Sequence, residues 1–358
     1  MAWNEAFASV DEMLSSGSLA DILGRRVRSV QRRPFAPPVW YSSGATFEGI
    51  HLDDEAVPSL VLKTAVPDRD WGAITFDDRV DREVRVWEAG LLDRLPSPAT
   101  HALMAAARPP TGYSLLMPNL SDQLLPDEAK ASPDSAVQRL VLQALAAMHE
   151  EFWLDESIRD PHVSLASLEA FVGHLSLASF ERVRAHIGAT IGQFIDEGWA
   201  TIAVGWERLR SIDAGVADEM WALANDPAPV VRAASRFPWT LVHTDPRPAN
   251  IAIDATNQRV YLLDWTRPAA APPALDLVYW LWAGNEHLSM PRDELLGCYR
   301  TELERRLGQR FSGDWWRPQL DVCFVAEFAC FAPIIAGRRP DSVSWWIDHV
   351  RPGLALLR

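Results

Sequence analysis

The sequence predicts an α+β protein with two lobes, and two observations support this fold class. Short strand-like runs separated by Pro, Gly and Asp occur within the first 118 residues. Helical periodicity dominates after them, apart from one β-like segment at 240–266. Strands followed by helices are typical of α+β proteins, and 358 residues suffice for two lobes. We therefore predict a small β-rich lobe at 1–118 and a large, mainly helical lobe at 119–358, joined near 117–122.

The first lobe is predicted to combine helices and strands. Residues 1–30 suit one or two helices, with an amphipathic stretch at 10–23. Five strand-like runs follow, at 39–41, 46–52, 59–63, 102–107 and 113–117. Residues 81–95 predict a helix, because apolar side chains recur there at offsets of three and four. These side chains are Val84, Trp87, Leu91 and Leu95.

The second lobe is predicted to be helical around one β-hairpin. Helical periodicity covers 137–152, 165–177, 180–209, 216–224 and most of the chain from residue 275 onward. The hairpin is expected from β-like runs at 240–242 and 260–263. Cys323 and Cys330 share one apolar helical face, so we expect them to be buried free thiols and not zinc ligands.

Composition narrows the function classes. A net charge of −14 argues against general nucleic-acid binding, which needs a basic surface, and suits a cationic or neutral small substrate. No apolar run approaches the roughly 20 residues of a membrane span, and the N-terminus does not resemble a signal peptide. We therefore expect a cytoplasmic protein without membrane or nucleic-acid partners. Most of the 16 tryptophans are expected to fill the core.

The loop His243-Thr-Asp245-Pro-Arg247-Pro-Ala-Asn250 is the strongest functional signal. Enzymes of the protein-kinase type use an H-x-D-x-x-x-x-N loop with a further Asp at the end of a following strand, and Asp264 stands at such a place. Two prolines stiffen the loop, which suits a general base that must keep its geometry. Asn250 and Asp264 offer the hard oxygen ligands that Mg²⁺ prefers.

The same loop residues also have simpler interpretations, as turn, scaffold or solvent-exposed residues. Asp245, Asn250 and Asp264 would serve as ordinary turn residues if the match stood alone. His243 is expected to be a packed scaffold residue that hydrogen-bonds the backbone. Arg247 projects either toward a transferring phosphoryl group, where charge must be neutralised, or into solvent.

The first lobe offers the other half of a nucleotide site. Lys63 ends the apolar run Leu60-Val-Leu, and Glu83 lies on the apolar-striped helix, so a salt bridge between them would hold the ammonium toward nucleotide phosphates. The alternative is a surface Lys and a surface Glu. Lys63 and Lys130 are the only lysines of the chain. Ser43 and Gly44 lie in a run of small residues whose backbone could approach phosphates.

Together these residues resemble the aminoglycoside phosphotransferase and choline kinase superfamily, the small-molecule relatives of protein kinases. The resemblance extends over about residues 40–285 and is most specific in the 243–250 loop and in Leu263-Asp264-Trp265. An Asp-Trp pair in place of Asp-Phe-Gly is typical of the small-molecule branch. The segment from Leu145 to Trp153, which contains His149, is also similar to that branch.

The resemblance implies a protein-kinase-like fold and a role for each motif residue. Asp245 would be the catalytic base, Asn250 and Asp264 would hold magnesium, and Lys63 with Glu83 would secure the ATP phosphates. Met117 and Asn119 would belong to a hinge whose backbone meets adenine. Asp276 would brace the catalytic loop, and His149 would be structural.

The loop departs from the family pattern at two positions. The family loop usually reads H-G-D, so Thr244 replaces a glycine and alters the backbone freedom there. Arg247 stands where protein kinases carry a lysine, which favours contact with the γ-phosphate.

We therefore predict an ATP- and Mg²⁺-dependent phosphotransferase that acts on a hydroxyl of a small molecule, such as an aminoglycoside, aminosugar or amino alcohol. The alternatives are a catalytically inactive kinase-like binding protein and a protein kinase. Trp280 and Trp282 would either stack on the acceptor or pack in the core. A cationic acceptor would be favoured by acids of the second lobe, namely Glu286, Glu294, Glu302 and Asp321.

Overall fold

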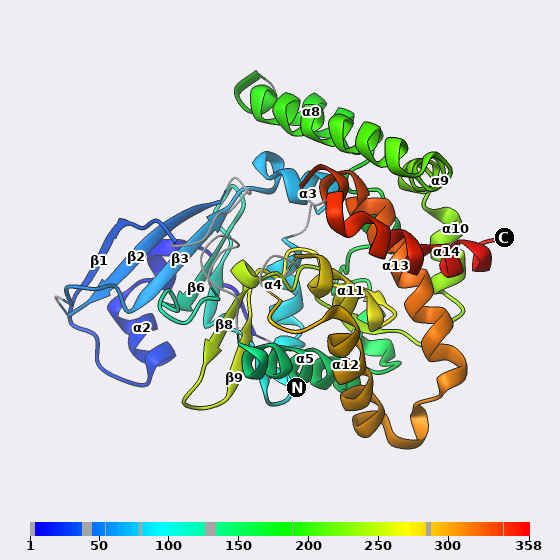
Figure 1. The fold of residues 1–358 in the computed structure, drawn as a ribbon. Coiled ribbons are helices and arrows are strands. Elements are labelled where there is room, and N and C mark those ends of the chain that lie inside the picture. Colours follow the sequence, from blue (N-terminus) through cyan, green and yellow to red (C-terminus); the bar gives the residue numbers. More distant parts are fainter. Residues whose placement is uncertain are drawn as a thin grey trace.

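The computed structural model describes most of the chain, namely residues 4–37, 45–53, 55–78, 81–125, 134–187, 189–283, 288–338 and 340–358. A β-rich lobe forms one end of the molecule and a helical lobe the other (Figure 1). The predicted two-lobed α+β fold is confirmed. The exact boundary at residue 118 stays a prediction.

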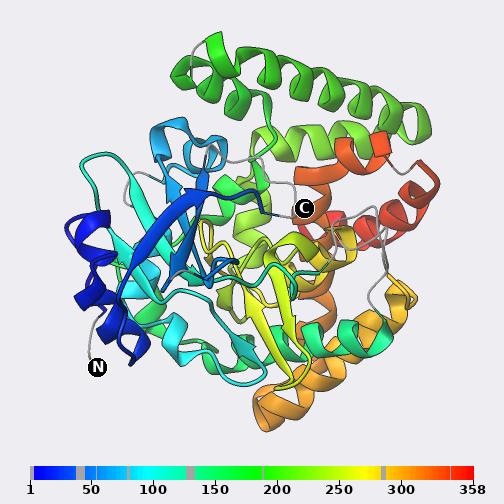
Figure 2. The same ribbon diagram turned by 90° about the vertical axis from the view of Figure 1, so that its left-hand side faces the viewer.

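A five-stranded antiparallel sheet forms the core of the N-terminal lobe (Figure 2). Its strands, in spatial order, are β1 (Val30–Pro34), β2 (Thr46–Leu52), β3 (Leu60–Ala65), β6 (Tyr113–Pro118) and β5 (Ala105–Ala107). Four of the predicted runs correspond to β2, β3, β5 and β6, whereas the run at 39–41 lies outside the described residues. The edge strand β1 was not predicted, and four of its five residues are exposed.

Helices cover both faces of this sheet. The two short helices α1 (Val10–Met13) and α2 (Ser16–Leu23) pack their apolar residues onto Ile50, Leu52 and Leu116. Helix α4 (Arg82–Glu88) belongs to the larger core on the other side, together with Leu115. The predicted helix at 81–95 was too long, because Gly90 adopts φ +68° and breaks it before a short 3₁₀ turn at Leu92–Arg94. The two shorter helical segments before α4 are a 3₁₀ turn (Pro67–Arg69) and α3 (Trp71–Thr75).

The β-like segment of the second lobe forms two small sheets. Strands β8 (Ile251–Asp254) and β9 (Arg259–Leu262) form a hairpin in which only β9 corresponds to a predicted run, that at 260–263. Strand β4 (Ala99–Thr100) adds in parallel to β9. Strand β7 (Thr240–Val242) pairs instead with β10 (Ala269–Ala271). The 243–250 loop therefore connects β7 to β8, and Asp264 follows β9.

Helices build the remainder of the second lobe. They are α5 (Ser135–Glu151), α6 (Leu168–Val172), α7 (Leu177–Ile187), α8 (Ala189–Ile212), α9 (Ala214–Asn225), α10 (Ala228–Ala234), α11 (Ala274–Ala283), α12 (Arg292–Leu307), α13 (Gly313–Arg338) and α14 (Val343–Leu356), with 3₁₀ turns at Glu156–Arg159, Pro248–Asn250, Gly308–Arg310 and Pro340–Ser342. Helix α8 runs along one edge of the lobe, at the top of Figure 1.

Helix α13 is the central helix of this lobe. It packs against α8, α11 and α14, and two glycines permit the closest approaches. A Cβ at Gly205 would lie 1.9 Å from the Pro333 carbonyl oxygen, and one at Gly353 would lie 2.2 Å from that of Asp321. By length and apolar composition α13 would suffice to cross a membrane, which our sequence criterion missed, but 89% of its most apolar window is buried inside the protein. Cys323 and Cys330 are buried free thiols on α13, as predicted.

Candidate functional site

Lys63 connects the two lobes through two carboxylates. Its ammonium lies 2.9 Å from Glu83 Oε2 on α4 and 2.7 Å from Asp264 Oδ1 after β9. Glu83 also accepts the backbone N–H of Trp265 at 3.0 Å, so the same carboxylate holds the strand end that carries Asp264. The surface alternative for Lys63 and Glu83 was wrong, because their exposed fractions are 7% and 1%.

The electrostatics favour the charged forms of Lys63 and Asp264, whereas burial raises the pKa of Glu83. Burial opposes the charge of the Lys63 ammonium, but Asp264 and Glu83 outweigh burial and raise its pKa. Burial also opposes the charge of Asp264, yet Lys63 lowers the pKa of this carboxyl to about 2. Lys63 is therefore a permanent cation at neutral pH, held between two acids.

Asp276 on α11 holds the start of the 243–250 loop by hydrogen bonds. The two oxygens of this carboxylate accept the backbone N–H groups of His243 at 2.8 Å and Thr244 at 2.7 Å. His149 on α5 lies 3.1 Å from the same carboxylate, and its other ring nitrogen meets the Tyr299 hydroxyl. Asp276 therefore contacts the loop as expected, and His149 contacts Asp276 and Tyr299 within the protein core, as expected of a structural residue.

Thr244 takes the backbone conformation that a glycine would adopt freely. Its φ is +64°, which is rare for a β-branched residue. Its hydroxyl donates to the Arg267 carbonyl oxygen at 2.7 Å and stabilises the strained turn. Thr244 therefore adopts the φ of a glycine, and its hydroxyl connects the loop to residue 267.

His243 packs inside the loop as a scaffold residue. Its Nε2 lies 2.9 Å from the Leu263 carbonyl oxygen, and its Nδ1 accepts the backbone N–H of Asp245 at 3.3 Å. Burial lowers the pKa of the His243 ring, so the ring is neutral near pH 7. This geometry agrees with the expected scaffold position.

Asn250 is oriented so that its carbonyl oxygen is available. Its Nδ2 donates to the Asp245 carbonyl oxygen at 3.0 Å, and Oδ1 has no hydrogen bond within the described part of the chain. The Leu263 N–H donates to the Asn250 carbonyl oxygen at 2.9 Å, which brings Asp264 next to Asn250. Asp264 has φ +66°, a conformation that aspartate tolerates and that often occurs at functional sites.

The Asn250 amide and the Asp264 carboxylate are ligand types that suit a magnesium ion. Among the described residues, no group of three His, Cys, Asp or Glu side chains could hold a metal ion. Mg²⁺ needs fewer protein ligands, because it retains waters and binds phosphate oxygens beside one or two carboxylates. One free amide oxygen and one carboxylate on the same cavity match that ligand set.

One cavity of about 120 Å³ collects most of the predicted nucleotide-site residues. It is lined by Lys63, Glu83, Met117, Asn119, Arg247, Asn250 and Asp264, among others. Asn119 already donates its backbone N–H to the Ser59 carbonyl oxygen, which removes that donor from any adenine contact. Ser43 and Gly44 lie outside the described residues. Asp245 does not line this cavity, but its carbonyl oxygen accepts a hydrogen bond from Asn250, which does.

Asp245 has two close partners that the sequence did not indicate. Arg267 Nη2 lies 2.7 Å from Asp245 Oδ1, and the Tyr279 hydroxyl donates to the same oxygen. The predicted neighbour Arg247 is farther away, with its Nε at 3.9 Å. Burial opposes the charge of Arg267, but Asp245 outweighs it and raises the pKa of the guanidinium. Tyr279 stands one helical turn after Asp276, which is the only signal that could have indicated it.

The family comparison covers the loop just described. The sequence model of the phosphotransferase enzyme family matches the chain over residues 194–308. The predicted resemblance is thereby confirmed, and the matched segment includes Asp245, Asn250 and Asp264. A comparison with curated proteins finds no match.

Solved structures of low sequence identity are similar over most of the chain. The GDP complex of aminoglycoside 2'-phosphotransferase-IIIa is 13% identical with a TM-score of 0.46, covering 98% of this chain and 97% of that one. Choline kinase LicA from Streptococcus pneumoniae is 12% identical with a TM-score of 0.46, covering 98% and 99%. The Plasmodium vivax ethanolamine kinase is 9% identical with a TM-score of 0.49, covering 97% and 85%.

The acids expected to attract a cationic acceptor are engaged elsewhere. Arginines neutralise them in the pairs Glu294–Arg139, Glu302–Arg305, Glu302–Arg306 and Asp321–Arg317, while Glu286 lies outside the described residues. These pairs do not support a cation-attracting role for the acids. Trp280 is fully buried, and Trp282 packs against Phe331 with ring centroids 4.5 Å apart, as the core-packing alternative predicts.

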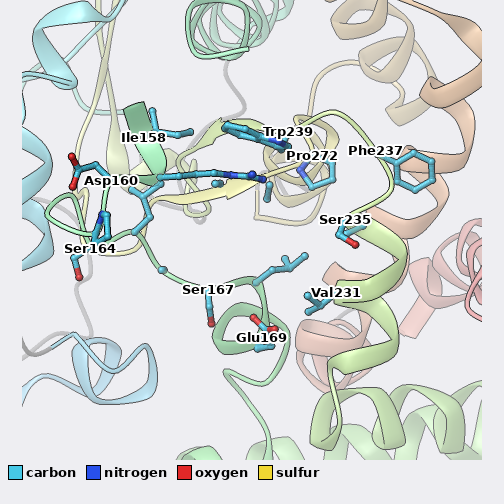
Figure 3. A pocket seen from close by; sticks show the side chains of 18 residues that line it. Ile158, Asp160, Ser164, Ser167, Glu169, Val231, Ser235, Phe237, Trp239 and Pro272 are labelled. Atoms are coloured by element: carbon cyan, nitrogen blue, oxygen red, sulfur yellow. The ribbon is translucent and has the colours of Figure 1, made fainter. Parts of the chain in front are cut away.

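A second, roomier cavity of about 400 Å³ is lined by residues from 158–169, 231–239 and 270–272 (Figure 3). Asp160, Glu169, Ser235 and Trp239 are among the residues around it. The guanidinium of Arg159, which also lines it, stacks 3.6 Å from the Trp239 ring centroid. None of the predicted site residues lines this cavity. We therefore assign the candidate site by its chemistry, at the smaller cavity.

Proposed function

We propose that the protein is a cytoplasmic kinase that uses ATP and Mg²⁺ to phosphorylate a hydroxyl group of a small molecule. The observation that carries this proposal is the convergence of Lys63, Glu83, Asn250 and Asp264 on one cavity, with Asp245 hydrogen-bonded to Asn250. Chance turn residues from four separate segments would have no reason to meet. The family match over 194–308 supports phosphotransfer as the reaction class.

Asp245 is assigned the role of general base. Its carboxylate would accept the proton of the acceptor hydroxyl as that oxygen forms a bond to the γ-phosphorus. The bond between the γ-phosphorus and the bridging oxygen to the β-phosphate breaks, and ADP leaves with that electron pair. Arg247, which lines the cavity and lies near Asp245, would neutralise charge on the transferring phosphoryl group.

The nucleotide end of the site is assigned to the lobe junction. Lys63 would hold the phosphates while Glu83 fixes the position of its ammonium. Asn250 Oδ1 and the Asp264 carboxylate would hold Mg²⁺, which neutralises phosphate charge when bound. Met117 and Asn119 would border the adenine base.

Nucleotide entry requires a change from the arrangement seen here. A cavity of about 120 Å³ is smaller than the roughly 300 Å³ at which ligand pockets usually begin. Lys63 and Asp264 also contact each other directly, although each is needed by a different part of Mg–ATP. We therefore propose that Mg–ATP separates this pair as it enters, and that the lobes move apart to admit it.

A second candidate function is a kinase-like binding protein without turnover. One specific observation favours it: both acids needed for chemistry are occupied, Asp245 by Arg267 and Asp264 by Lys63. Against it, Lys63, Asp245, Asn250 and Asp264 are all retained. Turnover separates the two candidates.

The test is an ADP-release screen with ATP or GTP and Mg²⁺. The acceptors are aminoglycosides, aminosugars, amino alcohols, nucleosides, macrolides and a generic protein substrate. The expected result is ADP release with at least one small molecule and its loss in the Asp245→Asn variant. Nucleotide binding without release for any acceptor would favour the inactive binding protein, and release only with the protein substrate would indicate a protein kinase.

A further inference from the structure

Helix α13 carries a fully buried carboxyl group, that of Glu327. Glu327 is fully buried, and neither of its side-chain oxygens has a hydrogen-bond partner within the described part of the chain. Buried polar groups normally have partners, so each exception asks for an explanation. The Nε of Arg267 is also buried without a partner among those residues.

These two unpartnered groups belong to the same region. Glu327, Cys330 and Phe331 share one face of α13, since they are spaced by three and four residues. The Phe331 ring contacts the Tyr279 ring with centroids 5.5 Å apart. This face of α13 therefore packs against Tyr279, whose hydroxyl binds Asp245. Burial raises the pKa of Glu327 well above its usual range, and the charge of Arg267 opposes that rise. Glu327 and Arg267 therefore both border the contact between Phe331 and Tyr279, because Glu327 lies one helical turn before Phe331 and Arg267 binds the Tyr279 hydroxyl.

The Arg267 guanidinium contacts both Asp245 and Tyr279 through the same nitrogen, Nη2. Its guanidinium is held at Asp245 Oδ1 at 2.7 Å and at the Tyr279 hydroxyl at 3.0 Å. The guanidinium carbon lies 5.3 Å from the centroid of the Phe76 ring and 5.6 Å from that of Tyr279, so aromatic rings border it. Arg267 Nη2 and the Tyr279 hydroxyl both occupy Asp245 Oδ1. An acceptor hydroxyl can therefore reach this oxygen only if one of the two side chains moves away.

We propose that Arg267 has two alternative partners: Asp245 in the acceptor-free protein and Glu327 when an acceptor hydroxyl occupies Asp245. Glu327 is then a positioning residue that acts through Arg267. The proposal rests on the role of Asp245 in the proposed function. The exchange needs no proton transfer, because the carbonyl oxygen of a neutral carboxyl group accepts an N–H bond. It also accounts for both unpartnered groups at once.

Kinetics of three buried-residue variants test the exchange. Glu327→Gln keeps a carbonyl acceptor and should retain most of kcat. Glu327→Leu removes the acceptor and should lower kcat about tenfold, with an unchanged KM for ATP, which is less than the loss expected for the base itself. The matched control is Gln319→Leu, because Gln319 is also fully buried on α13 with its side-chain amide unpartnered among the described residues.

Two features distinguish positioning from a packing effect. Glu327→Leu should raise Tm although it lowers kcat, since it removes an unsatisfied buried polar group. The double variant Arg267→Ala/Glu327→Leu should be no slower than Arg267→Ala, because Glu327 acts only through Arg267. Wild-type kcat in Glu327→Leu, an equal loss in Gln319→Leu, or additive losses in the double variant would each overturn the proposal.

A crystal structure of the Asp245→Asn variant gives a readout that needs no turnover. The neutral amide holds a guanidinium less strongly, so Arg267 should be found hydrogen-bonded to Glu327. Arg267 remaining at residue 245 would overturn the proposal. If the wild-type enzyme shows no phosphotransfer with any acceptor, the proposed function fails, and this structure still decides which partner Arg267 takes.

Discussion

The Lys63 ammonium lies 2.7 Å from Oδ1 of Asp264, a residue 201 positions later in the chain. Lys63 belongs to the sheet of the first lobe, whereas Asp264 follows a strand of the second lobe. The pair therefore links the lobes through the two groups that a Mg–nucleotide complex would separate. Stability and nucleotide binding should both depend on it.

Replacing Lys63 tests the first dependence. Lys63→Met leaves two carboxylates, Glu83 and Asp264, without their shared cation, and Glu83 is fully buried. Loss of one partner of a buried ion pair typically costs about 3 kcal/mol or more. We expect a lower free energy of unfolding in urea and no measurable nucleotide binding. Lys130→Met, at the other lysine of the chain, is the control. Equal stability of the two variants would contradict the role of the pair.

Asp264 should determine the magnesium dependence of nucleotide binding. Asp264→Asn keeps the size of the side chain but removes its charge, so the affinity for Mg–ATP should fall about 10-fold or more. Calorimetric titration of ATP at several Mg²⁺ concentrations measures this change. The same ATP affinity in wild type and variant at every Mg²⁺ concentration would exclude Asp264 as a metal ligand.

Asp245 should govern turnover and leave nucleotide binding intact. Asp245→Asn is expected to lower kcat about 10²- to 10⁴-fold, the usual contribution of a general base, with little change in ATP affinity. ADP release and calorimetry measure the two quantities. Asp348→Asn, at an exposed position on α14, is the matched control. Near-normal turnover in Asp245→Asn would remove Asp245 from the chemistry.

The Thr244 hydroxyl should stabilise the loop. Thr244→Val keeps the side-chain shape and the strained φ of +64° but leaves the buried Arg267 carbonyl oxygen without this donor. We expect a loss of about 1–3 kcal/mol in the free energy of unfolding. Thr244→Ser retains the hydroxyl and should remain close to wild type. If the valine and serine variants prove equally stable in urea, the hydroxyl bond contributes nothing.

Glu327 should make folding stability depend on pH. Burial raises the pKa of this carboxyl in the folded state above its value in the unfolded chain. Its contribution is therefore fully present below the unfolded pKa of about 4.5 and is lost as pH rises toward the folded pKa. Glu327→Gln does not titrate. The stability of wild type relative to Glu327→Gln should then decrease from about pH 5 to pH 7, by at most about 1.4 kcal/mol per pH unit. A constant difference in urea unfolding across this range would show that Glu327 does not titrate as described.

Local patterns were sufficient for the fold class and for most of the candidate site. Alternation of strand and turn residues indicated four of the five sheet strands, because each strand is specified by its own neighbours. The spacing within the 243–250 loop and the Asp264-Trp265 pair identified the loop, since these residues are held by short-range backbone geometry. The apolar context of Lys63 and of the helix carrying Glu83 indicated their pairing.

Contacts between distant segments were decided only by the tertiary structure. Tyr279 reaches Asp245 from α11 and Arg267 reaches it from the segment between β9 and β10, and no spacing along the chain encodes either approach. In the sequence, Glu327 is the one charged residue of the apolar stretch 322–337 of α13, and only the structure shows that it is buried without a partner among the described residues. The acids thought to attract a cation were assigned from charge alone, whereas the fold gave them arginine partners. By itself the sequence determined which residues could take part in phosphotransfer. Which charges meet, and how strongly each is held, depended on packing and burial, because electrostatic energies vary with distance and solvent exposure and not with position in the chain.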